Sequence, residues 1–196
     1  TSEGSEYIAS EHALHQILKL VHIYRPERIL EVGVGIGTIS SAVLDFNNDR
    51  SLTVEVFGTE ANDFCVEQIE NNIMPKENFF LYKDLSQLPD HLKFDFIIVD
   101  GAEDYLKSLR KRINSPAIIV VEGDRQDQTE TIKEIFPNSL FVHSVSGRKN
   151  RYNPHWSAKH YQNGLKVLFV NPQFSHYLTW LKLKLQSKYT YLFLRG

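Results

Sequence analysis

Residues 29–37 of this chain are ILEVGVGIG, a short apolar run that carries one acid, Glu31, and ends in glycines at alternate positions. Glycine weakens strands and helices alike, so three of them within five residues need a physical reason. A glycine-rich turn between a strand and the following helix allows a ligand to approach bare backbone beside the helix N-terminus. We therefore expect a strand before the turn, a helix after it, and a ligand close to Gly33, Gly35 and Gly37.

Outward from this turn, short apolar runs alternate with helical patterns. The first helix follows Ser10, a residue type typical of N-caps, and ends before Pro26. The runs FDFIIVD and AIIVVEG are continuously apolar, as in parallel strands that helices cover on both faces. This alternation predicts a doubly wound α/β domain. The expected strands are 28–32, 52–58, 79–82, 94–99 and 117–121, and the expected helices are 11–24, 38–46, 63–73, 105–113 and 128–136.

The end of the chain departs from this alternation. SLFVHSV at 139–145 and GLKVLFV at 164–170 are strand-like runs with no helical pattern between them. Two final strands without a crossover helix are expected to be antiparallel neighbours.

Composition limits the class of protein. A chain of 196 residues with 42% hydrophobic residues can bury one full core, which predicts a single main domain. The single cysteine, Cys65, excludes an intrachain disulfide and a cysteine-rich metal site. No run approaches roughly 18 consecutive apolar residues and no secretory signal is visible, so we expect a cytoplasmic protein.

Charge is distributed unevenly along the chain, although the net charge is only −2. All 24 acidic residues lie in 1–134 with 13 of the 22 lysines and arginines, whereas 135–196 holds nine bases and no acid. Such asymmetry concerns partners rather than the fold. It fits either a solvated basic face or an anionic substrate or surface that meets the last third of the chain.

The spacing of the glycines separates two classes of cofactor. The dinucleotide fingerprint is G-x-G-x-x-G, but Thr38 stands where its last glycine would fall, which disfavours an NAD enzyme. The run EVGVGIG instead resembles the first motif of class I S-adenosylmethionine-dependent methyltransferases, E/D-x-G-x-G-x-G. The resemblance extends over nearly the whole chain. It implies a Rossmann-like methyltransferase fold, with a mainly parallel seven-stranded sheet whose last strand is antiparallel.

The resemblance also implies a cofactor site. In that family the acid that ends the second strand, here Glu60 in VFGTE, holds the ribose hydroxyls, and the acid in FLYKDL, Asp84, contacts the adenine. Glu31 serves the ammonium group through water, and Asp100 in FDFIIVDG lies at the rim that faces cofactor and substrate. The full set implied for S-adenosylmethionine is Glu31, Gly33, Gly35, Gly37, Glu60, Ala61, Asp84, Leu85 and Asp100.

The lead-in to the glycine motif is similar to that of small O-methyltransferases related to catechol O-methyltransferase. Metal-dependent members bind magnesium through an acid of the fourth motif, an acid on the fifth strand and a following asparagine, and they use a lysine as base. Asp100 and Glu122 match the two acids, but Gly123 replaces the asparagine and Glu103 the lysine. Magnesium is therefore not favoured, although Asp100, Glu122 and Asp124 keep an oxygen-rich alternative open.

Methyl transfer depends on positioning and, where needed, on removal of a proton from the acceptor. The candidate bases are Asp100, His143 and the pair His155 and His160. His155 lies in the segment 146–164, which interleaves aromatic and basic residues and resembles the acceptor lid of the family. Such a lid suits an acid, sugar or phosphate-bearing acceptor.

The expected methyltransferase-like domain covers 1–172 and is followed by an amphipathic extension, 173–196. Leu178, Leu181 and Leu185 lie on one face of a helix in this extension. Such a helix can pack on the domain, join two subunits or lie on an anionic membrane surface. We favour packing or a homo-oligomer over peripheral membrane contact.

Together these features predict S-adenosylmethionine-dependent methyl transfer to an oxygen of a small or carbohydrate-like, anionic acceptor. Two alternatives stay open. One is a binding module that keeps the cofactor turn without catalysis, and the other is an aminopropyl transferase, for which no second acid is arranged convincingly beside Asp100 to bind a polyamine. Nucleic-acid methylation is disfavoured because VDGAEDY stands where an NPPY-type motif would follow the fourth strand.

Overall fold

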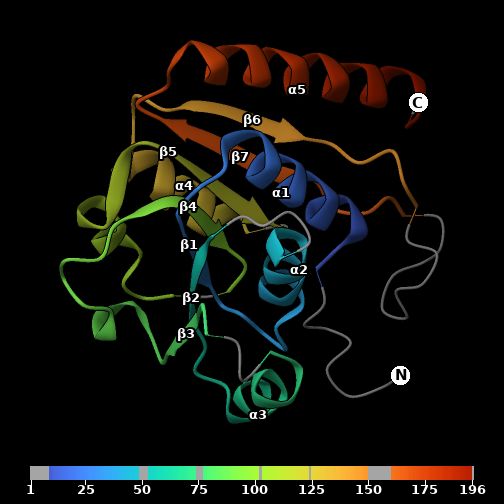
Figure 1. Ribbon diagram of the computed structural model, residues 1–196. Helices are drawn as coiled ribbons and strands as arrows, with labels where there is room; N and C mark the ends of the chain where they lie inside the picture. Colours follow the sequence, from blue (N-terminus) through green and yellow to red (C-terminus); the bar gives the residue numbers. More distant parts are fainter. Residues whose placement is uncertain are drawn as a thin grey trace.

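The central feature of the computed structural model is a twisted sheet (Figure 1). The structure describes residues 9–48, 53–73, 77–101, 103–123, 125–149 and 160–195. Within them seven strands form one sheet in the order β3-β2-β1-β4-β5-β7-β6. The strands are β1 (Arg28–Val32), β2 (Glu55–Thr59), β3 (Phe79–Tyr82), β4 (Phe94–Val99), β5 (Ile113–Glu122), β6 (Leu140–Ser144) and β7 (Leu165–Val170).

The pairing of the strands confirms the predicted sheet. β1 pairs in parallel with β2 and β4, and the parallel arrangement continues outward to β3 and β5. β7 lies between β5 and β6 and is antiparallel to both. The two final strands are therefore antiparallel neighbours, as their missing crossover helix indicates.

Helices cover both faces of the sheet and enclose two apolar clusters. On one face, α1, α2, α3 and α5 contribute to a cluster that includes Ile17, Val43, Ile69 and Leu183. On the other face, α4 and the short 3₁₀ helices η2 and η3 contribute to a second cluster. The helices are α1 (Glu11–Tyr24), α2 (Thr38–Asn48), α3 (Asp63–Asn72), η2 (Leu85–Gln87), η3 (Leu106–Lys111), α4 (Gln126–Ile135) and α5 (Phe174–Phe193).

The first helix forms where the sequence predicts it. The side chain of Ser10 caps α1 by accepting a hydrogen bond from the backbone N–H of Ala13. At the other end, Arg25 adopts a left-handed conformation and Pro26 follows. Ile17 and Val21 are among the side chains that α1 buries against the sheet. Local capping and a one-sided apolar face thus fix both ends of the helix.

Residues 105–113 differ from the prediction of an α-helix. The structure has the 3₁₀ helix η3 there, and β5 begins already at Ile113, which pairs with Phe94 of β4. Leu106 and Leu109 are buried three residues apart, a spacing that the 3₁₀ helix satisfies with one side. The early start of β5 leaves too few residues for a longer helix.

The C-terminal extension forms α5, which packs along β6 (Figure 1). The indole nitrogen of Trp180 donates to the Phe141 carbonyl at 2.8 Å, and Ser187 accepts from the backbone of β6's neighbour Val145 at 3.2 Å. The extension is thus held on the sheet along its length. None of the helices in the described ranges has the length and apolar character needed to cross a membrane.

A steric test concerns Gly33 and Gly101, whose backbones meet beyond the ends of β1 and β4. Gly33 has φ +81°, and a β-carbon on it would overlap with Gly101 Cα. Gly123 has a similar φ of +71°, but none of the described atoms lies within 4 Å of its β-carbon position. We expect Gly123→Ala to cost about 1–2 kcal/mol from backbone strain alone, and Gly33→Ala to cost about 3 kcal/mol or more.

Urea unfolding followed by circular dichroism measures both losses. Gly101→Ala, which adds the overlap without a positive φ, should also destabilise the protein more than Gly123→Ala. Equal losses at positions 33 and 123 would show that the close approach of the two backbones is unimportant.

Candidate functional site

A cleft of about 680 Å³ opens at the carboxyl ends of the central strands. Its volume falls in the usual range for small-molecule sites. In an open α/β sheet, ligands bind at this edge, because the loops after parallel strands converge there. The lining residues are Gly33, Gly35, Thr59, Glu60, Ala61, Lys83, Asp84, Asp100, Gly101, Glu103, Asp104, Tyr105, Glu122 and Arg125.

The glycine turn after β1 has two different reasons for its composition. Gly33 is required by the adjacent Gly101 backbone, and Gly37 by its φ of +92°, while Ile73 Cδ1 would also lie 2.6 Å from a β-carbon there. Gly35, with φ +57°, lines the cleft and points its N–H at Glu60. Backbone conformation and close packing within the chain therefore explain Gly33 and Gly37, and Gly37 does not line the cleft.

Glu60 connects the glycine turn to the turn after β2. One carboxylate oxygen accepts the Gly35 N–H at 2.8 Å, and the other accepts the Asn62 N–H at 2.8 Å. Each oxygen keeps a second acceptor site. The neighbouring Ala61 also lines the cleft. The carboxylate is thus fixed in place while still able to accept hydrogen bonds from a ligand.

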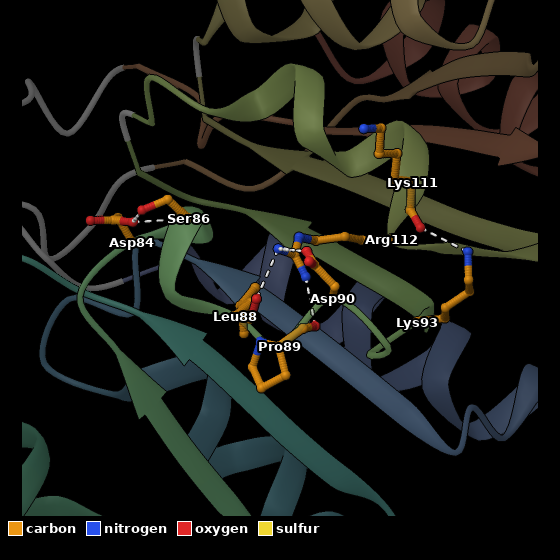
Figure 2. A network of polar contacts seen from close by, with 8 residues as sticks. All are labelled: Asp84, Ser86, Leu88, Pro89, Asp90, Lys93, Lys111 and Arg112. Carbon is orange, nitrogen blue, oxygen red and sulfur yellow. Dashed lines mark hydrogen bonds and ion pairs between the residues drawn. The ribbon is translucent and has the colours of Figure 1, made fainter.

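The loop after β3 contributes Asp84 to the cleft. Its carboxylate accepts hydrogen bonds from the backbone N–H and hydroxyl of Ser86, and the hydroxyl bond holds the pKa of Asp84 below its usual value (Figure 2). The next residue, Leu85, has a buried side chain, and its N–H donates to Glu103 at 3.2 Å. Asp84 therefore lines the site, whereas Leu85 contributes only backbone near it.

Arg112 anchors the far end of that loop (Figure 2). Its guanidinium is buried and donates to the carbonyls of Leu88 at 2.9 Å and Pro89 at 2.8 Å. These carbonyls follow η2, so Arg112 holds the segment that presents Asp84. The sequence pattern did not indicate this role, because Arg112 falls within a stretch predicted to be helical.

Glu31 is buried within β1 rather than exposed in the cleft. Its Oε2 accepts a hydrogen bond from the hydroxyl of Ser40 on α2, and its Oε1 has no partner among the described residues. Burial raises the pKa of Glu31 well above its usual value. An unpartnered buried carboxyl oxygen is costly, and a cationic group or water near it would relieve that cost.

Asp100, Glu122 and Arg125 form the polar centre of the cleft. Arg125 Nη2 donates to the backbone carbonyl of Asp100 and lies 3.1 Å from its Oδ1. Burial is the largest cause that raises the pKa of Asp100 to about 7, and the neighbouring carboxyl of Glu122 adds to it, while Arg125 opposes it. Glu122 also accepts the N–H of Ser10, the N-cap of α1, at 3.3 Å. Glu122 is therefore a second acid beside Asp100, an arrangement that the sequence alone did not make convincing for a polyamine.

The lining of the cleft is strongly acidic. Six of its side chains are carboxylic acids and only two, Lys83 and Arg125, are bases. A narrow site lined by one sign of charge raises the local concentration of ligands of the opposite sign. The cleft is therefore suited to a ligand that carries positive charge.

The predicted histidine bases are not brought to the cleft. His143 is exposed on β6, the outermost strand, and is absent from the lining. His155 lies outside the described residues, as does most of the segment that we expected to form a lid. His160 is described and exposed, but it does not line the cleft either. Of the four candidate bases, Asp100 alone is placed in the cleft by the described part of the chain.

The structure describes two of the three acids of the alternative magnesium site. Asp100 and Glu122 are neighbours, but Asp124 lies outside the described residues. Where the structure describes the chain, no three His, Cys, Asp or Glu side chains gather in a way that could hold a metal ion. A cation at Asp100 would also lie beside the Arg125 guanidinium. This arrangement does not fit a metal ion bound at Asp100.

Arg125 is the functional candidate that sequence reasoning missed. It lies just beyond the end of β5, where a basic residue after the paired acids could have indicated a partner for Asp100. Asp100 and Glu122 could be identified from the sequence because they match motifs of a known family. The contact of Arg125 with Asp100 could not, because it depends on the direction of the arginine side chain.

Comparison with known proteins supports the fold. No protein-family model matches the chain, and no curated protein does. Among solved structures, it is similar to an S-adenosylmethionine-dependent O-methyltransferase from Thermotoga maritima, with a TM-score of 0.60 and 13% identity over 85% of this chain and 67% of the other. A precorrin-6y C5,15-methyltransferase from Geobacter metallireducens has a TM-score of 0.59 and 16% identity over 86% and 91%.

A third similar structure is the tRNA (m1A58) methyltransferase from Aquifex aeolicus, with a TM-score of 0.57 and 16% identity over 83% of this chain and 69% of the other. The names of these three proteins specify very different acceptors. The likeness therefore establishes that the chain has the Rossmann-like methyltransferase fold, and it does not single out an acceptor or a nearest subfamily.

The two neighbours of Asp100 should shift its titration in opposite directions. Glu122→Gln removes a negative charge and should lower the pKa of Asp100 from about 7 toward its ordinary 3.8, whereas Arg125→Met removes a cation and should raise it. Carboxyl ¹³C NMR across a pH series measures the pKa directly. Asp104→Asn, a cleft acid that is not among the causes of the shift, is the control.

The same shift affects stability. The native carboxyl binds its proton more tightly than the unfolded one, so this group lowers stability as pH rises from about 4 to about 7. Glu122→Gln should flatten that decline in urea unfolding experiments. An unchanged Asp100 pKa in both variants would exclude the proposed coupling.

Proposed function

We propose that this protein transfers a methyl group from S-adenosylmethionine to an oxygen of a small acceptor. The observation that carries the proposal is the acidic cleft beside the glycine turn, at the sheet edge where Asp100, Glu60 and Asp84 converge. S-adenosylmethionine carries a sulfonium and an ammonium group, and both are cations. The fold is the one in which the compared methyltransferases bind their substrates, which supports the proposal by analogy.

The residues present fit this cofactor. The unpartnered oxygen of Glu31 lies beside the glycine turn, where an ammonium group acting through water would satisfy it. Glu60 keeps acceptor capacity for two hydroxyls, because each of its oxygens accepts only one N–H. Asp84 and Ala61 line the same cleft and can contact a purine base. When bound, the cofactor supplies a methyl group that its positive sulfur already activates.

The work left to the protein is to position the acceptor and to receive a proton. We assign the proton to an Asp100 carboxylate oxygen, because the pKa of this group is about 7 and a base works best near the ambient pH. Arg125 orients that carboxyl through its contacts with Oδ1 and the backbone carbonyl. The neighbouring Glu122 carboxyl raises the pKa of Asp100.

The acceptor is proposed to be small and hydroxylated. Oxygen is proposed as the methylated atom because a carboxylate is a base of modest strength, which suits the removal of a proton from an acidic hydroxyl group. The sequence-based expectation of an anionic acceptor rests on the nine bases and no acid beyond residue 134, whereas the lining of the cleft is acidic and gives it no support. Arg148 and Lys149 are described at the start of this basic segment, but they do not line the cleft.

The Asp100–Glu122 pair favours one second candidate, aminopropyl transfer. A polyamine acceptor is cationic, and the carboxyls of Asp100, Glu122 and Asp104 offer it counter-charges within one cleft. This reaction uses a decarboxylated relative of the same cofactor. A non-catalytic binding module is the remaining alternative, and the presence of a proton-accepting group in the cleft disfavours it.

Binding of the product analogue tests the cofactor site. We expect isothermal titration with S-adenosylhomocysteine to show micromolar affinity for the wild type. Glu60→Ala should weaken it by about 10- to 100-fold, because up to two charge-assisted hydrogen bonds are lost. Glu67→Ala on the exposed side of α3 is the matched control and should bind normally. A folded wild-type protein that binds nothing would refute the cofactor assignment.

Turnover separates the two transfer reactions. Methyl transfer predicts consumption of S-adenosylmethionine in a screen of small hydroxylated compounds, with kcat/KM rising as pH increases through about 7 and Asp100 loses its proton. Aminopropyl transfer predicts instead that decarboxylated S-adenosylmethionine and putrescine react. Asp100→Asn should abolish either activity while S-adenosylhomocysteine still binds. Activity that is insensitive to Asp100→Asn would refute its role as base.

A further inference from the structure

The outer face of α5 carries an apolar stripe that no described part of the chain covers. Seven large side chains follow one another mostly three or four positions apart, and each is exposed by 47% or more. A helical repeat of 3.6 residues places them on a single side. We call this set the α5 stripe: Phe174, Tyr177, Leu178, Leu181, Leu185, Tyr189 and Leu192.

The opposite side of α5 fixes the orientation of the stripe. His176 and Leu183 are buried against the sheet, and Trp180 and Ser187 bond to β6 and the residue after it. At the helix start, the hydroxyl of Tyr24 on α1 donates to Thr179 at 2.7 Å. Because α5 is held by its inner face, the stripe is turned outward and cannot be buried by a small rotation of the helix.

Cationic side chains border the stripe on both sides. Lys182 lies on one flank of the helix and Lys184 on the other, with the Lys184 ammonium over the Trp180 ring, whereas Lys188 lies within the stripe. All three lysines are exposed. Lysine side chains of this kind can lay their methylene stems along an apolar surface and keep the ammonium group in water. No acid occurs in α5 or anywhere else after residue 134.

A shallow groove extends the stripe toward α1. It has a volume of about 160 Å³ and lies between the two helices. Leu178 and Ile23, which is 49% exposed, supply apolar lining, and the cations Lys19 and Lys182 also line it. The groove therefore repeats the composition of the stripe, an apolar floor with positive groups at its edge.

A second copy of this chain is a poor match for this face. Two α5 helices packed stripe to stripe would bring six lysines together, in either orientation, without one carboxylate from α5 to offset them. Like charges placed opposite each other oppose association. A surface that offers hydrocarbon together with a dense negative charge would satisfy the stripe and its lysines at once.

We propose that α5 is a docking surface for anionic lipid bilayers, with its stripe lying in the interfacial layer and its lysines at the headgroups. A 20-residue helix is about 30 Å long, so it can lie flat along the surface. Peripheral amphipathic helices combine an apolar face with lysines in this way. The proposal does not depend on the cofactor or on the reaction in the cleft.

Vesicle co-sedimentation of the whole chain tests the proposal. We expect binding to vesicles in which about a third of the lipid is phosphatidylglycerol, and at least about tenfold weaker binding to pure phosphatidylcholine. Binding should weaken as sodium chloride is raised from about 0.1 M to about 0.5 M, because salt screens the lysines.

Two double variants separate the apolar and electrostatic contributions. Leu181→Ser with Leu185→Ser removes the centre of the stripe, and Lys184→Glu with Lys188→Glu reverses the charge of two of its lysines; each should lower the affinity for anionic vesicles at least about tenfold. The matched control is Lys107→Glu with Lys111→Glu, the same charge change on exposed residues of η3. Circular dichroism and thermal melting establish that every variant is folded, and the changed side chains are all exposed.

Three outcomes would overturn the proposal. The first is no binding to anionic vesicles by the folded wild type. The second is an equal loss in the η3 control, which would indicate a general charge effect. The third is a dimer, seen by light scattering, that Leu181→Ser with Leu185→Ser dissociates while vesicle binding is absent; the stripe would then be a subunit interface.

Discussion

The close approach of two backbones, at Gly33 after β1 and Gly101 after β4, is the constraint on which the site depends. The Asp100 N–H donates to the carbonyl of Val32 at 2.9 Å, so the turn after β4 is bonded directly to the end of β1. The N–H groups of Gly33 and Val34 in turn reach the carbonyl of Thr59 at the end of β2. Three strand ends are thereby joined, and a side chain at either glycine would separate them.

That junction concentrates carboxyl groups, and each is stabilised in a different way. Backbone N–H groups hold Glu60 and Glu103, and Ser86 holds Asp84. Burial and the neighbouring Glu122 raise the pKa of Asp100, and Arg125 lowers it. Hydrogen bonds from N–H groups fix a carboxylate without neutralising it, so most of the negative potential stays available to a ligand. A cleft organised in this way needs no rearrangement to receive a cation.

The parts of the fold and site that depend on patterns along the chain could be predicted from the sequence, whereas those that depend on side-chain contacts could not. Continuous apolar runs gave β1, β3 and β4 with correct bounds. The family resemblance pointed to Glu60, Asp84 and Asp100, and all three line one cleft. The partnership of Arg125 with Asp100 could not be predicted, since it depends on side-chain direction. His143 was a weaker candidate than it looked: it alternates with the buried Val142 and Ser144, which turns it outward on β6.

The charge asymmetry of the sequence becomes a separation in space. The acids that line the cleft all precede residue 134, because the cleft is built from the ends of β1, β2, β3, β4 and β5 and the loops that follow them. The acid-free remainder forms β6, β7 and α5, at the other edge of the sheet (Figure 1). A net charge of −2 thus conceals two regions of opposite sign. An anionic surface would attract the α5 side and repel the cleft, so the same asymmetry that concentrates a cationic ligand would also orient the molecule.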